Sequence, residues 1–306
     1  MIDSLLPQVL GELFCANLSS PIAMDRLIYH SDRIIDSAEI RLSPTIAGVV
    51  YGWGVFTNLH IYAGKPFAFD RHWDRLIRHA EKARVAIPIQ RDQAEPALAE
   101  LIKANSVEQG KARLMILRGD AGAWRTEKGR ESEFMIFTSP EVQRAGDPLA
   151  MTLSPYRLLS SSPLAGVKQT AMLENLLAFE EARGRGFSEA VMLNERGEIV
   201  SAASGNIFWV EGDELLTPSL STGCVAGVTR SFIQEIAARV NIYLVEGSYP
   251  LQRVLDSTEV FITSSLREIA SVASFDFKHY DLPQARVTRN LSREFQKLFG
   301  NGRILR

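Results

Sequence analysis

A lysine in a short apolar stretch is the residue of this sequence best suited to covalent chemistry. Lys168 follows Gly166 and Val167, and Ala171 comes shortly after it. In a partly apolar cleft, loss of solvation lowers the pKa of an amine and makes it a better nucleophile toward an aldehyde. Most lysines are solvated rather than catalytic, so this pattern alone leaves both interpretations open.

Three further features have the residue types that bind a phosphate. Residues 223–229 (GCVAGVT) run into a predicted helix, whose first backbone N–H groups attract anions. Residues 263–265 (Thr-Ser-Ser) follow a predicted strand, and Arg75 lies beside Trp73 in a predicted helix. Each has a plain structural alternative, namely a helix cap at Thr229, a hydroxyl turn at 263–265 and a surface salt bridge for Arg75.

The elements that would position these residues alternate between helix and strand. Apolar periodicity predicts helices at 69–85, 93–104, 169–185, 229–240 and 288–299. Short apolar runs predict strands at 26–29, 49–50, 57–62, 113–117, 133–138, 190–194, 199–201, 206–210, 215–216, 242–245 and 260–263. Because both halves mix the two kinds of element, we expect an α/β (α+β) fold.

The length of 306 residues predicts about two domains. We expect a helical extension over residues 1–26, a smaller domain over 27–140 and a larger domain over 155–306. The segment 140–163 is rich in Ser, Pro and Gly, so residues 141–154 are predicted to connect the domains.

Composition excludes several classes of protein. The 34 Lys and Arg against 36 Asp and Glu give a net charge of -2, which provides no general attraction to nucleic acid. No apolar run reaches about 18 residues, and the N-terminus lacks the basic start of a signal peptide. Cys15 and Cys224 are too few for a disulfide framework, which suits the cytoplasm. His72 and His79 share a predicted helix without a third ligand, so we expect no metal site.

Six motifs in order make the chain resemble the class IV aminotransferase family, the fold-type-IV pyridoxal-phosphate enzymes. They are YGWGVF at 51–56, GKPFAFDRHWDRL at 64–76, GVKQTAMLENLLAFEEA at 166–182, GNIFWV at 205–210, TPSLSTGCVAGVTR at 217–230 and EVFITSSLREI at 259–269. This family includes branched-chain and D-amino acid aminotransferases and aminodeoxychorismate lyases. The resemblance implies a two-domain fold like that of D-amino acid aminotransferase, with pyridoxal 5′-phosphate between the domains.

The resemblance also implies roles for the matched residues. Lys168 matches the lysine that holds the cofactor as a Schiff base and moves protons, and Arg75 matches the arginine on the cofactor phosphate. The other matches to the phosphate site are the turn of Gly227, Val228 and Thr229 and the loop of Ser264 and Ser265.

One position departs from the family pattern. The family usually has a glutamate five residues before the asparagine of its N-I-F motif; here that asparagine is Asn206 and the position holds Ser201. The glutamate keeps the pyridine nitrogen protonated, so the ring accepts electrons strongly. We expect the neutral Ser201 to disfavour 1,3-proton transfer more than β-elimination, in which the leaving group takes the electrons. The alternative is that Glu195 or Glu198 replaces the missing acid.

The substrate side is predicted in less detail. Phe56 matches an aromatic residue of the substrate pocket that is a tyrosine in some relatives. Arg118 and Arg125 lie in a polar loop, where either could pair with a substrate carboxylate or remain in solvent. Leu173 stands where branched-chain aminotransferases usually have a tyrosine, which makes the branched-chain subgroup a poorer match for this chain.

These features predict an aminotransferase that moves an amino group between an amino acid and a 2-oxo acid. The first alternative is an aminodeoxychorismate lyase, which releases pyruvate and 4-aminobenzoate by β-elimination. A second is a member of the family that binds the cofactor with little turnover, and a third is a structural or partner-binding protein that keeps only the fold. By resemblance we expect a homodimer that acts on a small amino acid or an aminodeoxychorismate-like substrate.

Overall fold

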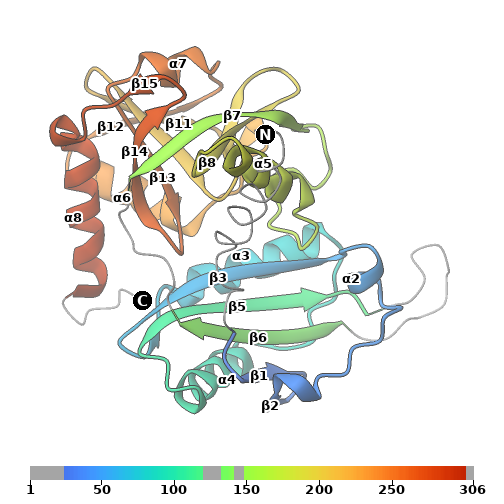
Figure 1. Cartoon of the computed structure of the whole chain (residues 1–306). Coiled ribbons are helices and arrows are strands. Elements are labelled where there is room, and N and C mark those ends of the chain that lie inside the picture. The colour runs from blue at the N-terminus through green and yellow to red at the C-terminus, as the bar shows by residue number, and fades with distance from the viewer. Residues whose placement is uncertain (1–23, 120–131, 141–147, 301–306) are drawn as a thin grey trace, which may run out of the picture.

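The chain forms two β-sheets with helices packed on them (Figure 1); the computed structural model describes residues 24–119, 132–140 and 148–300. The first sheet has six antiparallel strands in the order β2-β1-β6-β5-β3-β4. Its strands are β1 (Leu27–His30), β2 (Arg33–Asp36), β3 (Gly54–Tyr62), β4 (Lys65–Pro66), β5 (Gln109–Leu117) and β6 (Glu133–Pro140).

The side chains of strand β3 alternate between a face covered by helices and a face that carries polar and aromatic groups. Its Leu59 and Ile61 are buried under helices α3 (Phe69–Lys82) and α4 (Arg91–Ala104), as the two-residue period of a strand requires. Trp73 and Leu76 of α3 are buried in the same core. Figure 1 shows α3 on the side of the first sheet that faces the second sheet.

The second sheet has nine strands and mixes parallel with antiparallel pairs. The order is β12-β11-β10-β13-β14-β7-β8-β9, with β15 paired to β14. Its strands are β7 (Leu149–Leu158), β8 (Glu189–Asn194), β9 (Ile199–Ala202), β10 (Asn206–Glu211), β11 (Glu214–Pro218), β12 (Tyr243–Gly247), β13 (Glu259–Ser264), β14 (Glu268–Phe275) and β15 (Lys278–His279). The predicted mixed α/β fold is therefore confirmed.

Helices cover the second sheet in two groups. The amphipathic α6 (Val228–Arg239) and α8 (Arg286–Gly300) pack together, with Phe232 and Phe295 in their common core. Helix α5 (Leu173–Gly184) packs on β7 and β8 through Ala178 and Ala182. Short helices occur at α2 (Ala47–Val50) and α7 (Gln252–Asp256), with 3₁₀ turns at Ser37–Glu39, Leu220–Thr222 and Leu282–Gln284.

Two local predictions were wrong. Residues 49–50 form the end of helix α2 rather than a strand, because Ala47 and Gly48 are buried against β5; a Cβ on Gly48 would lie 2.5 Å from the Leu117 Cβ. Helix α5 begins at Leu173 rather than at residue 169, because the preceding residues pair with β3.

The predicted connection over residues 141–154 is also too long, since residues 149–158 form strand β7 within the second sheet. Leu149 and Met151 are buried, and the neighbours of β7 are β8 and β14, which are distant in sequence. Local Pro and Ser content therefore concealed a strand that tertiary pairing stabilises. The domain boundaries themselves stay a prediction, and the expected N-terminal extension lies mostly outside the described residues.

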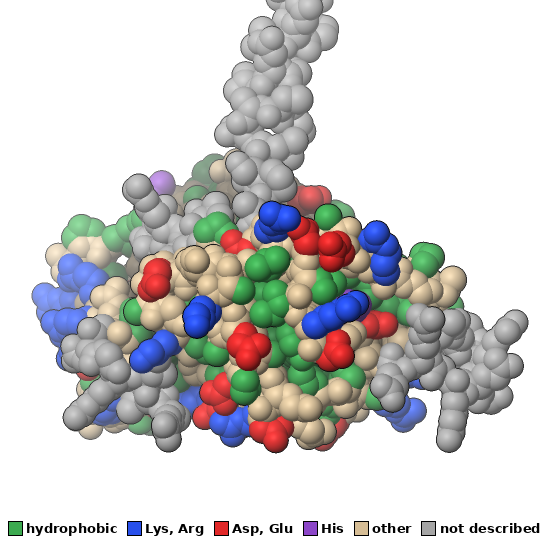
Figure 2. Space-filling view, turned by 90° about the horizontal axis from the view of Figure 1, so that it is seen from below, with side chains coloured by type: hydrophobic (Ala, Val, Ile, Leu, Met, Phe, Trp, Pro, Cys, Tyr) green, Lys and Arg blue, Asp and Glu red, His purple; other side chains and the backbone are tan. Residues whose placement is uncertain are grey.

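The described surface carries charges of both signs. Figure 2 shows one face, on which basic and acidic side chains are interspersed with hydrophobic ones instead of gathering by sign. No helix in the described part of the chain is long and apolar enough to cross a membrane. Within the same residues, no group of three or more His, Cys, Asp or Glu side chains is arranged to hold a metal ion.

Candidate active site

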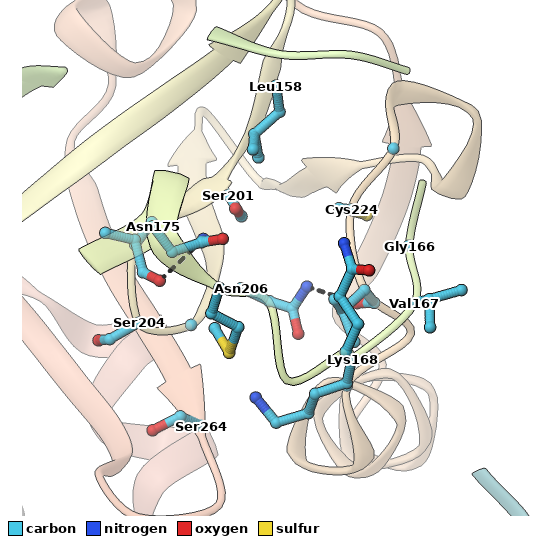
Figure 3. Close-up of a pocket in the computed structure, with 18 of the residues that line it drawn as sticks. Leu158, Gly166, Val167, Lys168, Asn175, Ser201, Ser204, Asn206, Cys224 and Ser264 are labelled. Atoms are coloured by element: carbon cyan, nitrogen blue, oxygen red, sulfur yellow. Dashed lines mark hydrogen bonds between the residues drawn. The ribbon is translucent and has the colours of Figure 1, made fainter. Parts of the chain in front are cut away.

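A cavity of about 290 Å³ lies where the two sheets meet, and it brings together most of the predicted site residues (Figure 3). Asn58 of β3 and Arg75 of α3 line it from the first sheet. The lining also includes Lys168, Ser201, Gly227, Val228, Thr229, Ser264 and Ser265. Asn58 and Ser265, which are 207 positions apart in the sequence, thus line one cavity.

Lys168 is held in place by an added piece of strand. The chain around it pairs with the N-terminal part of β3: Phe56 N–H donates to the Lys168 carbonyl at 3.1 Å, and Thr170 N–H donates to the Gly54 carbonyl at 3.0 Å. The Lys168 N–H donates to His79 Nδ1 at 3.0 Å. These three bonds fix the backbone, so the side chain extends into the cavity in one direction (Figure 3).

The Lys168 amine lies in a setting that favours its neutral form. Its Nζ lies 4.5 Å from the centre of the Phe56 ring, and no carboxylate among the described residues contributes to its titration. Burial, followed by the positive charges of Arg75 and Arg113, lowers the pKa of Lys168 to about 7. A large share of the amine is therefore unprotonated, and nucleophilic, at neutral pH.

Arg75 is a buried cation with spare donors. Only 4% of the residue is exposed, and its Nη2 donates to Thr57 Oγ1 at 2.8 Å. Among the described residues its Nε has no hydrogen-bond partner, and no carboxylate pairs with it. Burial, with Arg78 second, lowers the pKa of Arg75 to about 10, so the group stays charged at neutral pH. The surface salt bridge considered from the sequence is therefore not formed.

The turn before α6 presents a helix N-terminus to the same cavity. Gly227 is the N-cap residue, and an added Cβ there would lie 2.1 Å from Asn206 Oδ1. Asn206 Nδ2 in turn donates to the Val225 carbonyl at 2.8 Å and fastens the turn. Because Gly227 rather than Thr229 occupies the cap position, the Thr229 hydroxyl is not consumed by capping.

The two serines after β13 complete this end of the cavity. Ser264 Oγ accepts the Arg267 N–H at 3.1 Å, so it takes part in a hydroxyl turn as well as lining the cavity. Ser265 Oγ lies 3.5 Å from His72 Nε2. One end of the cavity therefore combines a cation, a helix N-terminus and hydroxyls, the usual components of a phosphate site.

The wall around Ser201 is neutral. Ser201 of β9 lies near Asn175 of α5 and Ser204 (Figure 3). Asn175 Nδ2 donates to the Ala203 carbonyl at 3.1 Å, and the Ser204 hydroxyl donates to Glu189, outside the lining. Glu174 is the one carboxylate residue among the described side chains that line the cavity.

The two acids considered as replacements for the missing glutamate lie elsewhere. Glu195 accepts from the Ser160 N–H and hydroxyl at 2.8 and 2.7 Å, and Glu198 pairs with Arg196 at 2.6 Å. Neither belongs to the cavity lining. That alternative is therefore wrong, and the Ser201 position lacks a substitute acid from this turn.

Sequence reasoning missed Arg113, which lies beside the predicted Phe56; neither residue belongs to the cavity lining. The Arg113 guanidinium lies 4.7 Å from the centre of the Phe56 ring, and its Nε donates to Asn58 Oδ1 at 2.9 Å. Phe56 is thus contacted by both Arg113 and Lys168. The signal was a single arginine that pairs in register with Asn58, just before the apolar residues that end strand β5.

The two loop arginines predicted for substrate binding have different outcomes. Arg118 lies 4.0 Å from the Trp53 ring centre and donates to the Arg84 carbonyl at 3.4 Å, and it is not in the cavity lining. Arg125 falls outside the described residues.

Comparison with known proteins agrees with this geometry. The family described as amino-transferase class IV matches residues 54–275. The chain belongs to this family. Within the class IV aminotransferases, the aminodeoxychorismate lyase of Bacillus subtilis strain 168 is 28% identical over 287 residues, which cover 90% of this chain and 95% of that protein. A putative branched-chain-amino-acid aminotransferase of Methanocaldococcus jannaschii is 28% identical over 275 residues, covering 89% and 96%.

Solved structures show the class IV fold directly. The branched-chain aminotransferase of Thermoproteus uzoniensis, solved with norvaline, superposes with a TM-score of 0.84 at 24% identity, covering 90% of this chain and 94% of that one. A putative 4-amino-4-deoxychorismate lyase of Legionella pneumophila gives 0.79 at 22%, covering 85% and 96%. The chain is thus a class IV enzyme of the aminotransferase or lyase type, and the family depends on pyridoxal 5′-phosphate.

Proposed function

We propose that the cavity binds pyridoxal 5′-phosphate and that the chain is an aminotransferase acting between amino acids and 2-oxo acids. The observation that carries this proposal is the meeting of a lysine of pKa about 7 and a buried, carboxylate-free arginine in one cavity. A nucleophilic amine suits the aldehyde of the cofactor, and an unpaired cation suits its phosphate.

The residues of the phosphate end fit this group. Arg75 supplies the charge, the Gly227–Val228 turn supplies backbone donors, and Thr229 and Ser265 supply hydroxyls. The Arg75 Nε, which has no partner among the described residues, is the kind of orphaned donor that an anion nearby would satisfy.

Lys168 performs the proton transfers in this proposal. When bound, the cofactor supplies an aldehyde carbon and an electron-accepting ring. The Lys168 amine, when not bonded to the cofactor, would take the α-proton of the substrate as general base, for which a pKa of about 7 is well matched. In transamination Lys168 would also return the proton, and the bound group would keep the amino group while the substrate leaves as a 2-oxo acid.

The second candidate is an aminodeoxychorismate lyase, and the neutral Ser201 wall favours it. There the substrate's bond to its β-substituent breaks after proton removal, and pyruvate and 4-aminobenzoate are the products. A cofactor ring held beside Ser201 without a carboxylate partner for its nitrogen would hold negative charge less well, which would hinder elimination less than proton transfer.

Arg113 and Phe56 are proposed as the substrate-facing side. Arg113 is held by Asn58 and by the Phe56 ring on the same side of β3 as Lys168. A substrate carboxylate there would meet a fixed guanidinium, which can bind it through two parallel hydrogen bonds.

A homodimer is proposed from the exposed apolar groups beside the cavity. Leu173 and Leu176 of α5 are 64% and 57% exposed, and Tyr51 is 50% exposed. Surfaces of this kind usually mark an interface. Light scattering that shows one chain per particle at micromolar concentration would contradict it. The cytoplasm is the proposed location, since Cys224 is a buried free thiol.

The function is tested on the purified full chain. We expect a yellow absorbing species with pyridoxal 5′-phosphate that borohydride fixes on Lys168, located by peptide mass spectrometry. A panel of D- and L-amino acids and aminodeoxychorismate then separates the candidates. Loss of colour with an amino donor indicates transamination, whereas pyruvate release without a 2-oxo acceptor indicates elimination. A protein that stays colourless with added cofactor contradicts both.

A further inference from the structure

A chain of four polar side chains links the two sheets behind the phosphate end of the cavity. Arg75 Nη2 donates to Thr57 Oγ1 at 2.8 Å, and the same Oγ1 lies 2.8 Å from His72 Nδ1. The other ring nitrogen, His72 Nε2, lies 3.5 Å from Ser265 Oγ. Thr57, His72 and Arg75 belong to β3 and α3, whereas Ser265 follows β13. This series of hydrogen bonds thus joins Arg75 and Ser265, two residues of the phosphate end that come from different sheets.

The donors in this chain can be assigned one after another. An arginine only donates, so Thr57 Oγ1 accepts from Arg75. Among the described residues, His72 Nδ1 is the acceptor within reach of the Thr57 hydroxyl hydrogen. A Nδ1 that accepts leaves the proton of a neutral imidazole on Nε2, the atom that faces Ser265.

The surroundings keep His72 neutral. The residue is 1% exposed, and burial, followed by the charges of Arg75 and Lys168, lowers the pKa of His72 well below its ordinary value. A neutral imidazole ring has one donor and one acceptor, and the contacts with Ser265 and Thr57 use both of them.

We infer that His72 is a positioning residue that sets the direction of the Ser265 hydroxyl. Because Nε2–H donates to Ser265 Oγ, the hydroxyl hydrogen of Ser265 is left to point into the cavity. A phosphate dianion only accepts hydrogen bonds, so this orientation presents it with a donor. The same chain holds Arg75 through Thr57. This inference rests on the proposed binding of pyridoxal 5′-phosphate.

A histidine that merely fills space would behave differently from a positioning one. Loss of packing would weaken every ligand of the cavity and lower the melting temperature. Loss of positioning would weaken only ligands that carry a phosphate. Pyridoxal, which lacks the phosphate, therefore separates the two roles.

The test measures dissociation constants of the cofactor-free full chain for pyridoxal 5′-phosphate and for pyridoxal. We expect His72→Phe to weaken binding of the phosphate form about tenfold, the usual effect of one hydrogen bond to a charged group, and to leave pyridoxal binding unchanged. His60→Phe is the matched control, because His60 is also buried on the first sheet, stacks on Tyr62 at 4.1 Å and does not line the cavity.

Two further variants keep the inference testable if His72→Phe does not fold. His72→Gln retains a donor near the Nε2 position and should restore most of the phosphate preference. Ser265→Ala and His72→Leu should each lose the preference, and the double variant should lose no more than either single variant, because the two residues act on one hydrogen bond.

Equal weakening of both ligands by His72→Phe, or full additivity of the Ser265 and His72 changes, would overturn the inference. If the wild-type chain binds pyridoxal 5′-phosphate with no preference over pyridoxal, the proposed phosphate end is wrong as well. If the wild type keeps the preference and only the His72 variants leave it unchanged, the proposed function stands and the inference alone fails.

Discussion

The two ends of the cavity differ in the kind of control they place on a ligand. The phosphate end has Arg75, the α6 N-terminus and a relay of hydrogen bonds through Thr57 and His72. The opposite wall, around Ser201 and Asn175, offers neutral groups. In the proposed function, affinity and reactivity are therefore separated in space: one end would hold the phosphate of the cofactor, and the other would decide how strongly its ring accepts electrons. Lys168 would serve both ends.

The largest effect on turnover is expected from changing Lys168, which lies between the two ends of the cavity. Lys168→Ala removes the nucleophile and the base together, so turnover should fall by at least ~10³-fold. The phosphate end is untouched, so cofactor should still bind without covalent attachment. Steady-state kinetics and borohydride labelling check this, with Lys82→Ala, an exposed lysine that caps the Ala165 carbonyl, as control. Undiminished turnover in the Lys168 variant would remove the basis of the proposed mechanism.

The next effect tests the phosphate end alone. Arg75→Gln removes the buried cation, and we expect binding of pyridoxal 5′-phosphate to weaken roughly 10- to 100-fold, with pyridoxal little affected. Arg78→Gln, one turn further along α3 and exposed, is the matched control. Fluorescence titration of the cofactor-free chain measures both. A result in which both variants bind the cofactor alike contradicts the assignment of Arg75.

A smaller effect is expected at the neutral wall. Ser201→Glu places a carboxylate opposite the ring nitrogen, so the ratio of transamination to elimination should rise about tenfold, the effect of about 1.4 kcal/mol. The cofactor spectrum should change with it. Ser201→Gln has similar size without the charge and is expected to leave the ratio near the wild-type value. If the Glu and Gln variants behave alike, charge at this wall does not control the reaction.

The smallest effect concerns the pH dependence of Lys168 in the cofactor-free chain. Its pKa of about 7, against 10.5 for an ordinary lysine, means that the neutral amine increases as pH rises through 7. An amine-reactive reagent should therefore modify Lys168 with a midpoint near pH 7. Between pH 7 and 10.5 Lys168 is protonated in the unfolded chain and mostly neutral in the folded one. The contribution of Lys168 to the free energy of unfolding therefore rises with pH in this range. Peptide mass spectrometry against Lys82 measures the midpoint; one near 10 contradicts the burial argument.

Sequence reasoning succeeded where a feature depends on local order. The amphipathic spacing of α3 and α6 placed Arg75 and Thr229 on helices, and six ordered motifs led to the class IV family. It failed where partners are distant in the chain. Strand β7 was hidden by Pro and Ser around it, and the start of α5 was displaced because residues 168–170 pair with β3.

The sequence by itself determined which chemical groups are available: one lysine in an apolar stretch, a glycine turn before a helix, an arginine and two serines. It also determined that Ser201 is neutral. Only the tertiary structure decided that Arg75 lacks a carboxylate partner, that Glu195 and Glu198 point to other groups, and that Arg113 contacts Phe56. The physical reason is that charge, hydrogen bonding and desolvation act over a few ångströms of space, whereas residues in contact, such as His72 and Ser265, can be about 190 positions apart in the chain.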